Sequence, residues 1–177
     1  AGSALVTCAL EEDHNDDPTR PAATAQAVEG GYTLSGSKIC VDAATHSARI
    51  LLSAQAEDGL VVALVDPRAA GVALNPQVVT SGETRHELVM DQVQVGAEDI
   101  LATGREALEA MDWAQQATRT ALCAMALGLC DKMMRITGQY TSEREQFGRA
   151  IATFQAVSHR VADCYIDVEC LRLVTQQ

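Results

Sequence analysis

Basic residues and long apolar runs are both scarce in this sequence. Its 177 residues contain 13 Lys and Arg against 24 Asp and Glu, which gives a formal net charge of −11. A chain this acidic lacks the basic field that displaces counterions from nucleic acid, and it lacks a polybasic segment for anionic lipid. No run of about 18 apolar residues occurs, so we expect no membrane-spanning segment. The expected partners therefore include no nucleic acid and no membrane.

Paired cysteine motifs are also missing. No C-x-x-C pair occurs, and no spacing of Cys and His fits a zinc site. No charged and apolar leader opens the chain. We therefore expect reduced thiols in the core of a cytoplasmic protein, without a metal, at Cys8, Cys40, Cys123, Cys130, Cys164 and Cys170.

Proline is absent from Gly104 onward, and the hydrophobic pattern changes there from strands to helices. We therefore predict two domains, 1–102 and 103–177. The first contains short alternating or apolar runs, and turn signals at Gly30-Gly31 and Glu57-Asp58-Gly59 favour two hairpins. This pattern predicts a small antiparallel barrel or sandwich, with strands near 4–10, 23–29, 32–41, 49–56, 60–65, 71–78 and 86–95.

The second domain contains two amphipathic patterns. The first predicts a helix of roughly 35 residues, broken near Gly148, and the second predicts a helix from 154 onward. Two helices cannot bury all their apolar faces against each other. We therefore expect the first two helices of an incomplete four-helix bundle, in a fragment or in a chain whose core other segments complete. The fold class predicted for the chain is α+β.

The segment at 140–157, YTSEREQFGRAIATFQAV, resembles the signature of flavin-dependent acyl-CoA dehydrogenases. In that family a helix ends in Y-x-x-x-R-x-x-F-G, a tight turn follows, and the next helix opens with F-Q or H-Q. Upstream, LSGSK at 34–38 is similar to the family's L-x-G-x-K strand. The resemblance covers essentially the whole chain. It implies a full protein about twice as long, with helices before Ala1 and after Gln177.

The resemblance also implies a chemistry and a set of site residues. The family removes two hydrogens from an acyl-CoA with FAD, and usually passes the electrons to an electron-transferring flavoprotein. Arg144 is then expected to hold the pyrophosphate, and Phe147, Phe154 and Gln155 to contact the FAD of a neighbouring subunit. Arg119 is expected near the acyl-CoA. The alternatives are an ion pair of Arg144 with Glu143 or Glu145, a core position for Phe147, and a solvated Arg119.

The first domain departs from the family pattern where the flavin ring is expected. Backbone contacts from Leu10, Glu11 and Val41 would survive, because they do not depend on side chains. However, Glu11 replaces a hydroxyl, Cys40 replaces an aromatic ring, and Asp42 replaces a hydroxyl near the flavin. One branch of the family has its glutamate base where Thr118 stands, and the commoner branch has it in a part beyond this sequence. We therefore assign no catalytic residue in this chain.

Three functions fit these residues. In the first, the chain is the partner subunit of a heterotetramer, as in the actinobacterial branch that acts on steroid side chains, and it completes a shared flavin site. In the second, it is a self-sufficient homotetrameric dehydrogenase. In the third, it is an assembly module of the same fold without enzymatic activity.

Overall fold

The computed structural model describes residues 4–176, and they form two compact units that divide between Gln115 and Gln116. The first unit is built mainly of strands and the second of helices, which confirms the α+β class. Among the described residues, no helix is both long and apolar enough to cross a membrane.

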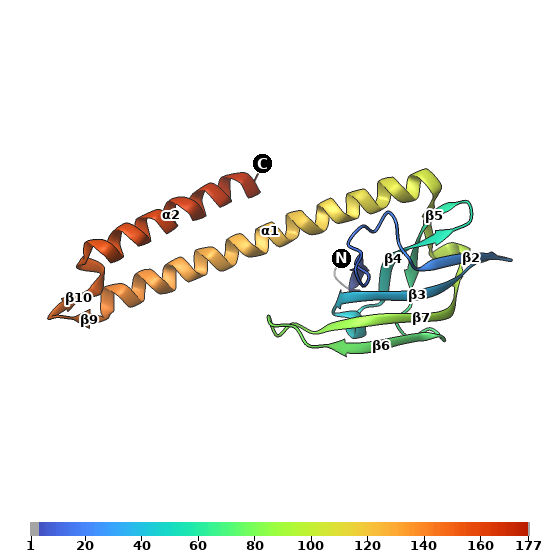
Figure 1. Cartoon of the computed structure of the whole chain (residues 1–177), viewed down its shortest axis with the longest axis horizontal. Coiled ribbons are helices and arrows are strands. Elements are labelled where there is room, and N and C mark those ends of the chain that lie inside the picture. The colour runs from blue at the N-terminus through green and yellow to red at the C-terminus, as the bar shows by residue number, and fades with distance from the viewer. Residues whose placement is uncertain (1–3, 177) are drawn as a thin grey trace. The chain divides into compact units, whose positions relative to one another are not determined.

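The first unit is an eight-stranded sheet whose strands follow most of the predicted runs (Figure 1). Both predicted hairpins form, and in each the two strands pair antiparallel. The sequence prediction missed one short strand, β8, which directly precedes the long helix. The strands are β1 (Val6–Ala9), β2 (Thr24–Val28), β3 (Gly31–Asp42), β4 (Arg49–Ala56), β5 (Gly59–Val65), β6 (Val72–Gln77), β7 (Arg85–Gly96) and β8 (Ile100–Thr103).

The sheet is mixed and open rather than purely antiparallel or closed. Its order is β6-β7-β3-β2-β4-β5-β8, and β1 pairs with β4 outside this path. The pairs β1–β4 and β2–β4 are parallel, and β2 meets β4 at one position only, Thr24 with Gln55. Hairpin signals indicate only neighbouring antiparallel strands, so they do not reveal these non-local parallel pairings.

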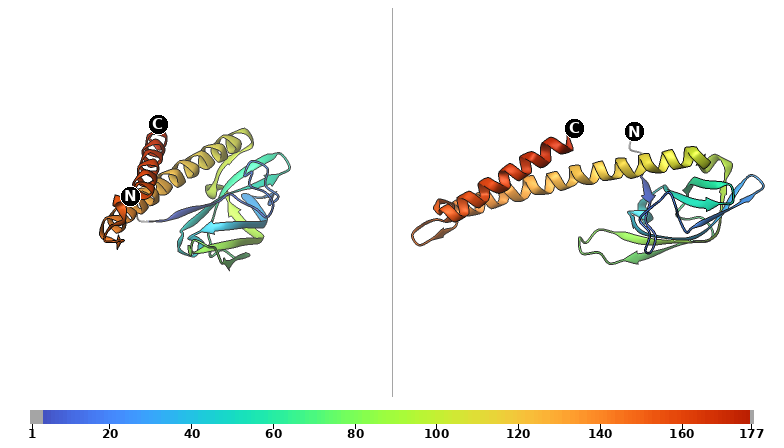
Figure 2. Two further views of the ribbon diagram at one scale, coloured as in Figure 1. Left: turned by 60° about the vertical axis from the view of Figure 1, so that its left-hand side comes forward. Right: turned by 45° about the horizontal axis from the view of Figure 1, so that its top comes forward.

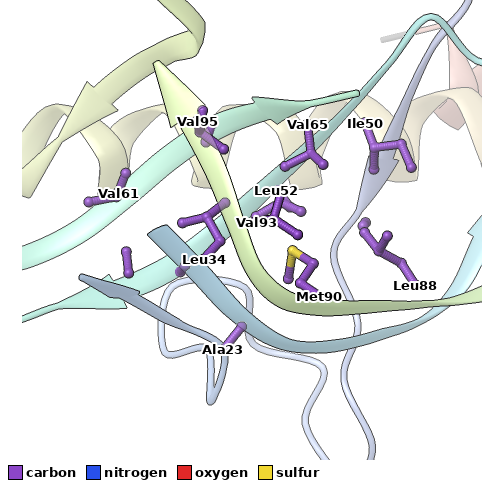
Figure 3. Close-up of a cluster of buried hydrophobic side chains, with 14 of the residues drawn as sticks. Ala23, Leu34, Ile50, Leu52, Val61, Val65, Leu88, Met90, Val93 and Val95 are labelled. Atoms are coloured by element: carbon purple, nitrogen blue, oxygen red, sulfur yellow. The ribbon is translucent and has the colours of Figure 1, made fainter. Parts of the chain in front are cut away.

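The two halves of the sheet pack against each other through one apolar core. Figure 3 shows Leu34 of β3 and Val93 of β7 beside Leu52 of β4 and Val61 of β5. These four side chains are at most 1% exposed. The core therefore joins strands that are distant in sequence, as in a sandwich.

Strand β5 is buried on both faces, which explains its unbroken apolar sequence. Val61 belongs to the core between the sheet halves, whereas Leu60 and Val62 pack against Ala107 and Met111. The last two residues lie in the first turns of helix α1 (Gly104–Glu143). The first unit, which we call the β-unit, is therefore covered by the start of the helix that leads into the second unit.

The second unit is a helical hairpin. Helix α2 (Gln155–Thr175) runs back along α1 (Figure 2), and Arg172 Nη2 of α2 lies 2.9 Å from Asp131 Oδ1 of α1. Short strands β9 (Glu145–Gln146) and β10 (Arg149–Ala150) connect the helices. Most of the predicted apolar stripe of α1 is exposed in this chain, namely Leu122, Met125, Leu129, Met133, Ile136 and Tyr140. This agrees with the expectation of an incomplete bundle.

The cysteines differ from the prediction in one respect. All six are free thiols, as expected, but none is fully buried. Cys8, Cys40 and Cys130 are half-buried, while Cys123, Cys164 and Cys170 are exposed. The last three lie in the helical unit, where few side chains are covered, so they are not core residues of this chain.

Candidate functional site

The connection between the two helices is a tight β-hairpin that carries the predicted arginine and phenylalanine. Gln146 pairs with Arg149, and Phe147 and Gly148 form the turn with φ of 55° and 76°. Two consecutive residues with positive φ are typical of a type I′ turn. Glycine adopts this conformation freely, but a bulky residue does so at a cost of about 1–3 kcal/mol. The strained residue is Phe147.

The same turn exposes the Phe147 side chain, which is 94% accessible. Its ring meets the half-buried ring of Phe154 edge-on, with centroids 6.1 Å apart and an interplanar angle of 83°. The guanidinium of Arg149 lies over the same Phe154 ring, 4.2 Å from its centroid. The core position considered for Phe147 is therefore wrong for this chain.

Arg144 lies between the end of α1 and this hairpin, with an exposed side chain. Its carbonyl accepts a hydrogen bond from the N–H of Ile151, which closes the base of the hairpin. The ion pairs found among the described residues do not include the alternative pair of Arg144 with Glu143 or Glu145. Glu143 instead accepts a hydrogen bond from Gln139 at 2.9 Å. The guanidinium is thus presented without a carboxylate partner.

Gln155, the first residue of α2, is exposed, and its position directly follows Phe154. The structure therefore brings Arg144, Phe147, Phe154 and Gln155 to one end of the helical hairpin, and we call this end the hairpin tip. Arg119 lies elsewhere on α1 and is exposed. Sequence reasoning missed Arg149, although it lies within the quoted motif, because a cation over an aromatic ring leaves no distinctive spacing.

A second group of predicted residues lies in the β-unit, where residues 10–11 meet the last part of β3. The N–H of Ile39 donates to the carbonyl of Glu11 at 2.9 Å, which places 10–11 beside 39–41. With the residues that flank them, these segments make up 10–12 and 38–42, which we call the β-edge. Leu10 is half-buried and Glu11 is exposed, whereas Val41 is fully buried. Val41 has no exposed surface at all and is paired with His86 of β7, so neither its side chain nor its backbone is accessible to a ligand in this chain.

A buried ion pair ties the two segments of the β-edge together. Lys38 Nζ lies 2.7 Å from Glu12 Oε1, and the residues are 0% and 6% exposed. Glu12 also accepts the N–H groups of Ala22 and Ala23. Because Glu12 follows Glu11 and Lys38 precedes Ile39, the pair fixes both segments. The sequence signal was present in the L-x-G-x-K match, but no spacing rule identified Glu12 as the partner.

The environment lowers the pKa of both Glu12 and Lys38. Burial alone would raise the pKa of Glu12, but hydrogen bonds from Lys38, Ala22 and Ala23 outweigh it and hold the pKa below its usual range. Burial lowers the pKa of Lys38, and the Glu12 carboxylate opposes this effect. A buried charge without its partner is very costly, so each group depends on the other.

Cys40 occupies a β-bulge on this edge. Strand β3 has one residue more than β7 between the pairs Lys38–Leu88 and Val41–His86, and Cys40 takes the left-handed φ of 56°. The N–H of Cys40 donates to Gln77 Oε1 at 2.8 Å, and its carbonyl lies 3.4 Å from Arg85 Nη1. Side chains of β6 and β7 therefore occupy both polar backbone groups of Cys40. The N–H of Cys40 is therefore not available to a ligand while its hydrogen bond to Gln77 persists.

Asp42 is exposed at the end of β3, directly opposite Arg85 in the register of β7. The guanidinium of Arg85 also lies 2.9 Å from Glu83 Oε2. Hydrogen bonding to Glu83 raises the pKa of Arg85, and hydrogen bonds from Arg85 and Ser81 lower the pKa of Glu83. The β-edge thus carries the carboxylates of Glu11 and Asp42 where the family pattern has hydroxyls, and Arg85 lies opposite Asp42.

The strained turn leads to a first prediction. Phe147→Asn gives Asn-Gly, the preferred pair in a type I′ turn, so the free energy of unfolding should rise by up to about 1 kcal/mol. The same change removes the exposed ring, so it should weaken the binding of any ligand that packs on this ring. Urea unfolding and ligand titration measure the two effects. Lower stability in Phe147→Asn would mean that Phe147 serves the fold of this chain.

Comparison with known proteins assigns relatives to both units. The family model for the C-terminal domain of acyl-CoA dehydrogenases matches residues 105–177. Acyl-CoA dehydrogenase FadE27 of Mycobacterium tuberculosis is 30% identical over 177 residues, which is 100% of this chain and 45% of the relative. The chain thus spans about half the length of the relatives that it matches.

Two solved structures that are more than 30% identical to this chain have the same fold. The ChsE4–ChsE5 complex from Mycobacterium tuberculosis is 31% identical, with a TM-score of 0.84 over 99% of this chain and 46% of the matched one. A variant of the Tcur3481–Tcur3483 steroid ACAD is 39% identical, with the same TM-score and the same coverage of both chains.

Proposed function

Because the chain belongs to the acyl-CoA dehydrogenase family, we propose that it forms part of an FAD-dependent oxidoreductase that desaturates an acyl-CoA between its α and β carbons. Bound FAD would supply the hydride acceptor. The chain contributes a middle β-domain, 1–102, and the first two helices of the helical domain, 103–177. An electron-transferring flavoprotein is the proposed electron acceptor, and the cytoplasm the proposed location.

The observation that carries this proposal is the exposed hairpin tip. Arg144 presents a planar guanidinium with no ion pair among the described residues, and such a fork fits a pyrophosphate. Phe147, three residues later in the sequence, presents a side chain that is 94% exposed. Hydrogen-bond donors and aromatic surface are the groups that a dinucleotide requires, so the residues fit FAD. We assign Arg144, Phe147, Phe154 and Gln155 to the flavin of a neighbouring subunit, and Arg119 to the acyl-CoA.

We further propose that this chain is the partner subunit of a heterotetramer. Its own β-edge carries Glu11 and Asp42, and a carboxylate beside a reduced, anionic flavin is repulsive. The bulge at Cys40 has both of its polar backbone groups occupied. Thr118 cannot act as a carboxylate base. The relatives described as ChsE4–ChsE5 and Tcur3481–Tcur3483 support a complex of unlike subunits, and the second name supports a steroid substrate.

The buried Glu12–Lys38 pair favours a second candidate, the self-sufficient homotetramer. This pair and the bond from Ile39 to Glu11 keep the backbone of the β-edge in place. Backbone contacts from Leu10 and Glu11 would then hold a flavin despite the altered side chains, whereas Val41, which is fully buried, would have to become accessible to add its own contact. The two candidates agree on the hairpin tip and differ on whether the chain's own β-edge holds FAD.

Visible absorption of the purified full-length protein separates the candidates. We expect no flavin band from the protein expressed alone, and a band when it is co-expressed with a second acyl-CoA dehydrogenase subunit. A band from the protein alone would establish the homotetramer instead. Absence of flavin in both preparations would reject the proposed function and leave the assembly module.

A further inference from the structure

We propose that Arg149 is a positioning residue for the flavin contact at the hairpin tip. The inference rests on the proposed function and adds a residue that the sequence motif did not assign. Arg149 acts through Phe154: its guanidinium covers one ring, and that ring in turn holds the exposed ring of Phe147.

The geometry supports a chain of two contacts. Arg149 lies 4.2 Å from the centroid of Phe154, well within the distance of about 6 Å at which a cation is attracted to a ring face. The edge-on contact between Phe154 and Phe147 has the favoured T-shaped arrangement. Arg149 and Phe147 belong to the same hairpin, whereas Phe154 directly precedes α2. The contacts therefore join the hairpin to the start of α2.

The two contacts restrict the motion of the Phe147 ring, which the turn leaves exposed. The backbone holds Phe147 in a strained conformation and leaves its side chain 94% exposed. An exposed ring would otherwise sample several rotamers, and ordering it upon binding would cost affinity. Contact with Phe154 restricts the ring before a ligand arrives, and Arg149 restricts Phe154. Arg149 has no ion pair among the described residues that would draw it elsewhere.

The effect can be measured as the affinity of the full-length assembly for FAD. After removal of the flavin, we expect Arg149→Gln to weaken FAD binding about two- to five-fold, which corresponds to the strength of an exposed cation–aromatic contact. Arg149→Lys keeps a cation over the ring and should restore part of the loss. The matched control is Arg105→Gln, which removes an exposed arginine whose partner is Glu109 in the first unit.

A double-variant cycle tests whether Arg149 acts through Phe154. In a Phe154→Leu background, Arg149→Gln should cause no further loss, because the ring that it positions is gone. Additive losses would mean that Arg149 contacts the cofactor directly, and an unchanged affinity in Arg149→Gln would show that it has no role; either result overturns the inference. If Arg144→Ala also leaves FAD affinity unchanged in the same titration, the proposed function fails and the inference with it.

Discussion

Replacing Lys38 by Met should destabilise the β-unit more than any other single change considered. The substitution leaves the Glu12 carboxylate buried without its cation, and breaking such a pair costs about 3–5 kcal/mol. Glu12 keeps the two N–H donors of Ala22 and Ala23, so the loss should not exceed this range. Urea unfolding curves of the wild type and of Lys38→Met give the difference.

The pH dependence of stability should also change sign. In the wild type the pKa of Glu12 is lowered by folding, so its contribution is present above its unfolded pKa of about 4.3 and is lost as the pH falls through the folded value. In Lys38→Met, burial without the ammonium should raise the folded pKa of Glu12 above the unfolded one. The folded variant then binds more protons than the unfolded chain, so its stability should increase as the pH falls from 7 towards 4.

Two further variants control this prediction. Lys38→Met combined with Glu12→Gln removes both charges and keeps an acceptor for the backbone, so it should recover most of the loss. Arg105→Met breaks the exposed pair with Glu109 and should cost less than about 1 kcal/mol. If Lys38→Met cost no more than Arg105→Met, the pair would not be a determinant of the β-edge.

Local signals in the sequence predicted most of the elements correctly. The hairpin of β4 and β5 followed from two apolar runs with Glu57-Asp58-Gly59 between them, and the structure pairs Ala56 with Gly59 across that turn. The long helix followed from its 3.6-residue pattern and the absence of proline. Such features depend on neighbouring residues, so the sequence contains the information directly.

Features that depend on distant residues were not predicted. The parallel pairing of β1 with β4 joins segments about 40 residues apart, and no turn signal encodes it. The contact between Lys38 and Glu12, and those of Cys40 with Gln77 and Arg85, likewise arise only when the sheet assembles. At the hairpin tip the motif identified Arg144 and Phe147, but it did not predict that Phe147 would be exposed and strained in the turn. Their assignment to a flavin remains a prediction.

Arg144→Ala should cause the largest loss of function among the variants considered. A guanidinium donating two parallel hydrogen bonds to a pyrophosphate contributes about 1.5–3 kcal/mol, so the assembled full-length enzyme should bind FAD about 10- to 150-fold more weakly. The free energy of unfolding should hardly change, because the Arg144 side chain is exposed and its backbone carbonyl still accepts from Ile151.

The comparison of three variants separates a cofactor contact from a structural role. Arg144→Lys keeps the charge but loses the planar fork, so its FAD affinity should lie between those of the wild type and Arg144→Ala. Lys132→Ala removes another exposed cation of α1 and should leave the affinity unchanged. Flavin absorption after dialysis against limiting FAD measures all three. Loss of folded protein in Arg144→Ala, with normal affinity in the fraction that remains folded, would show that Arg144 stabilises the chain rather than the cofactor.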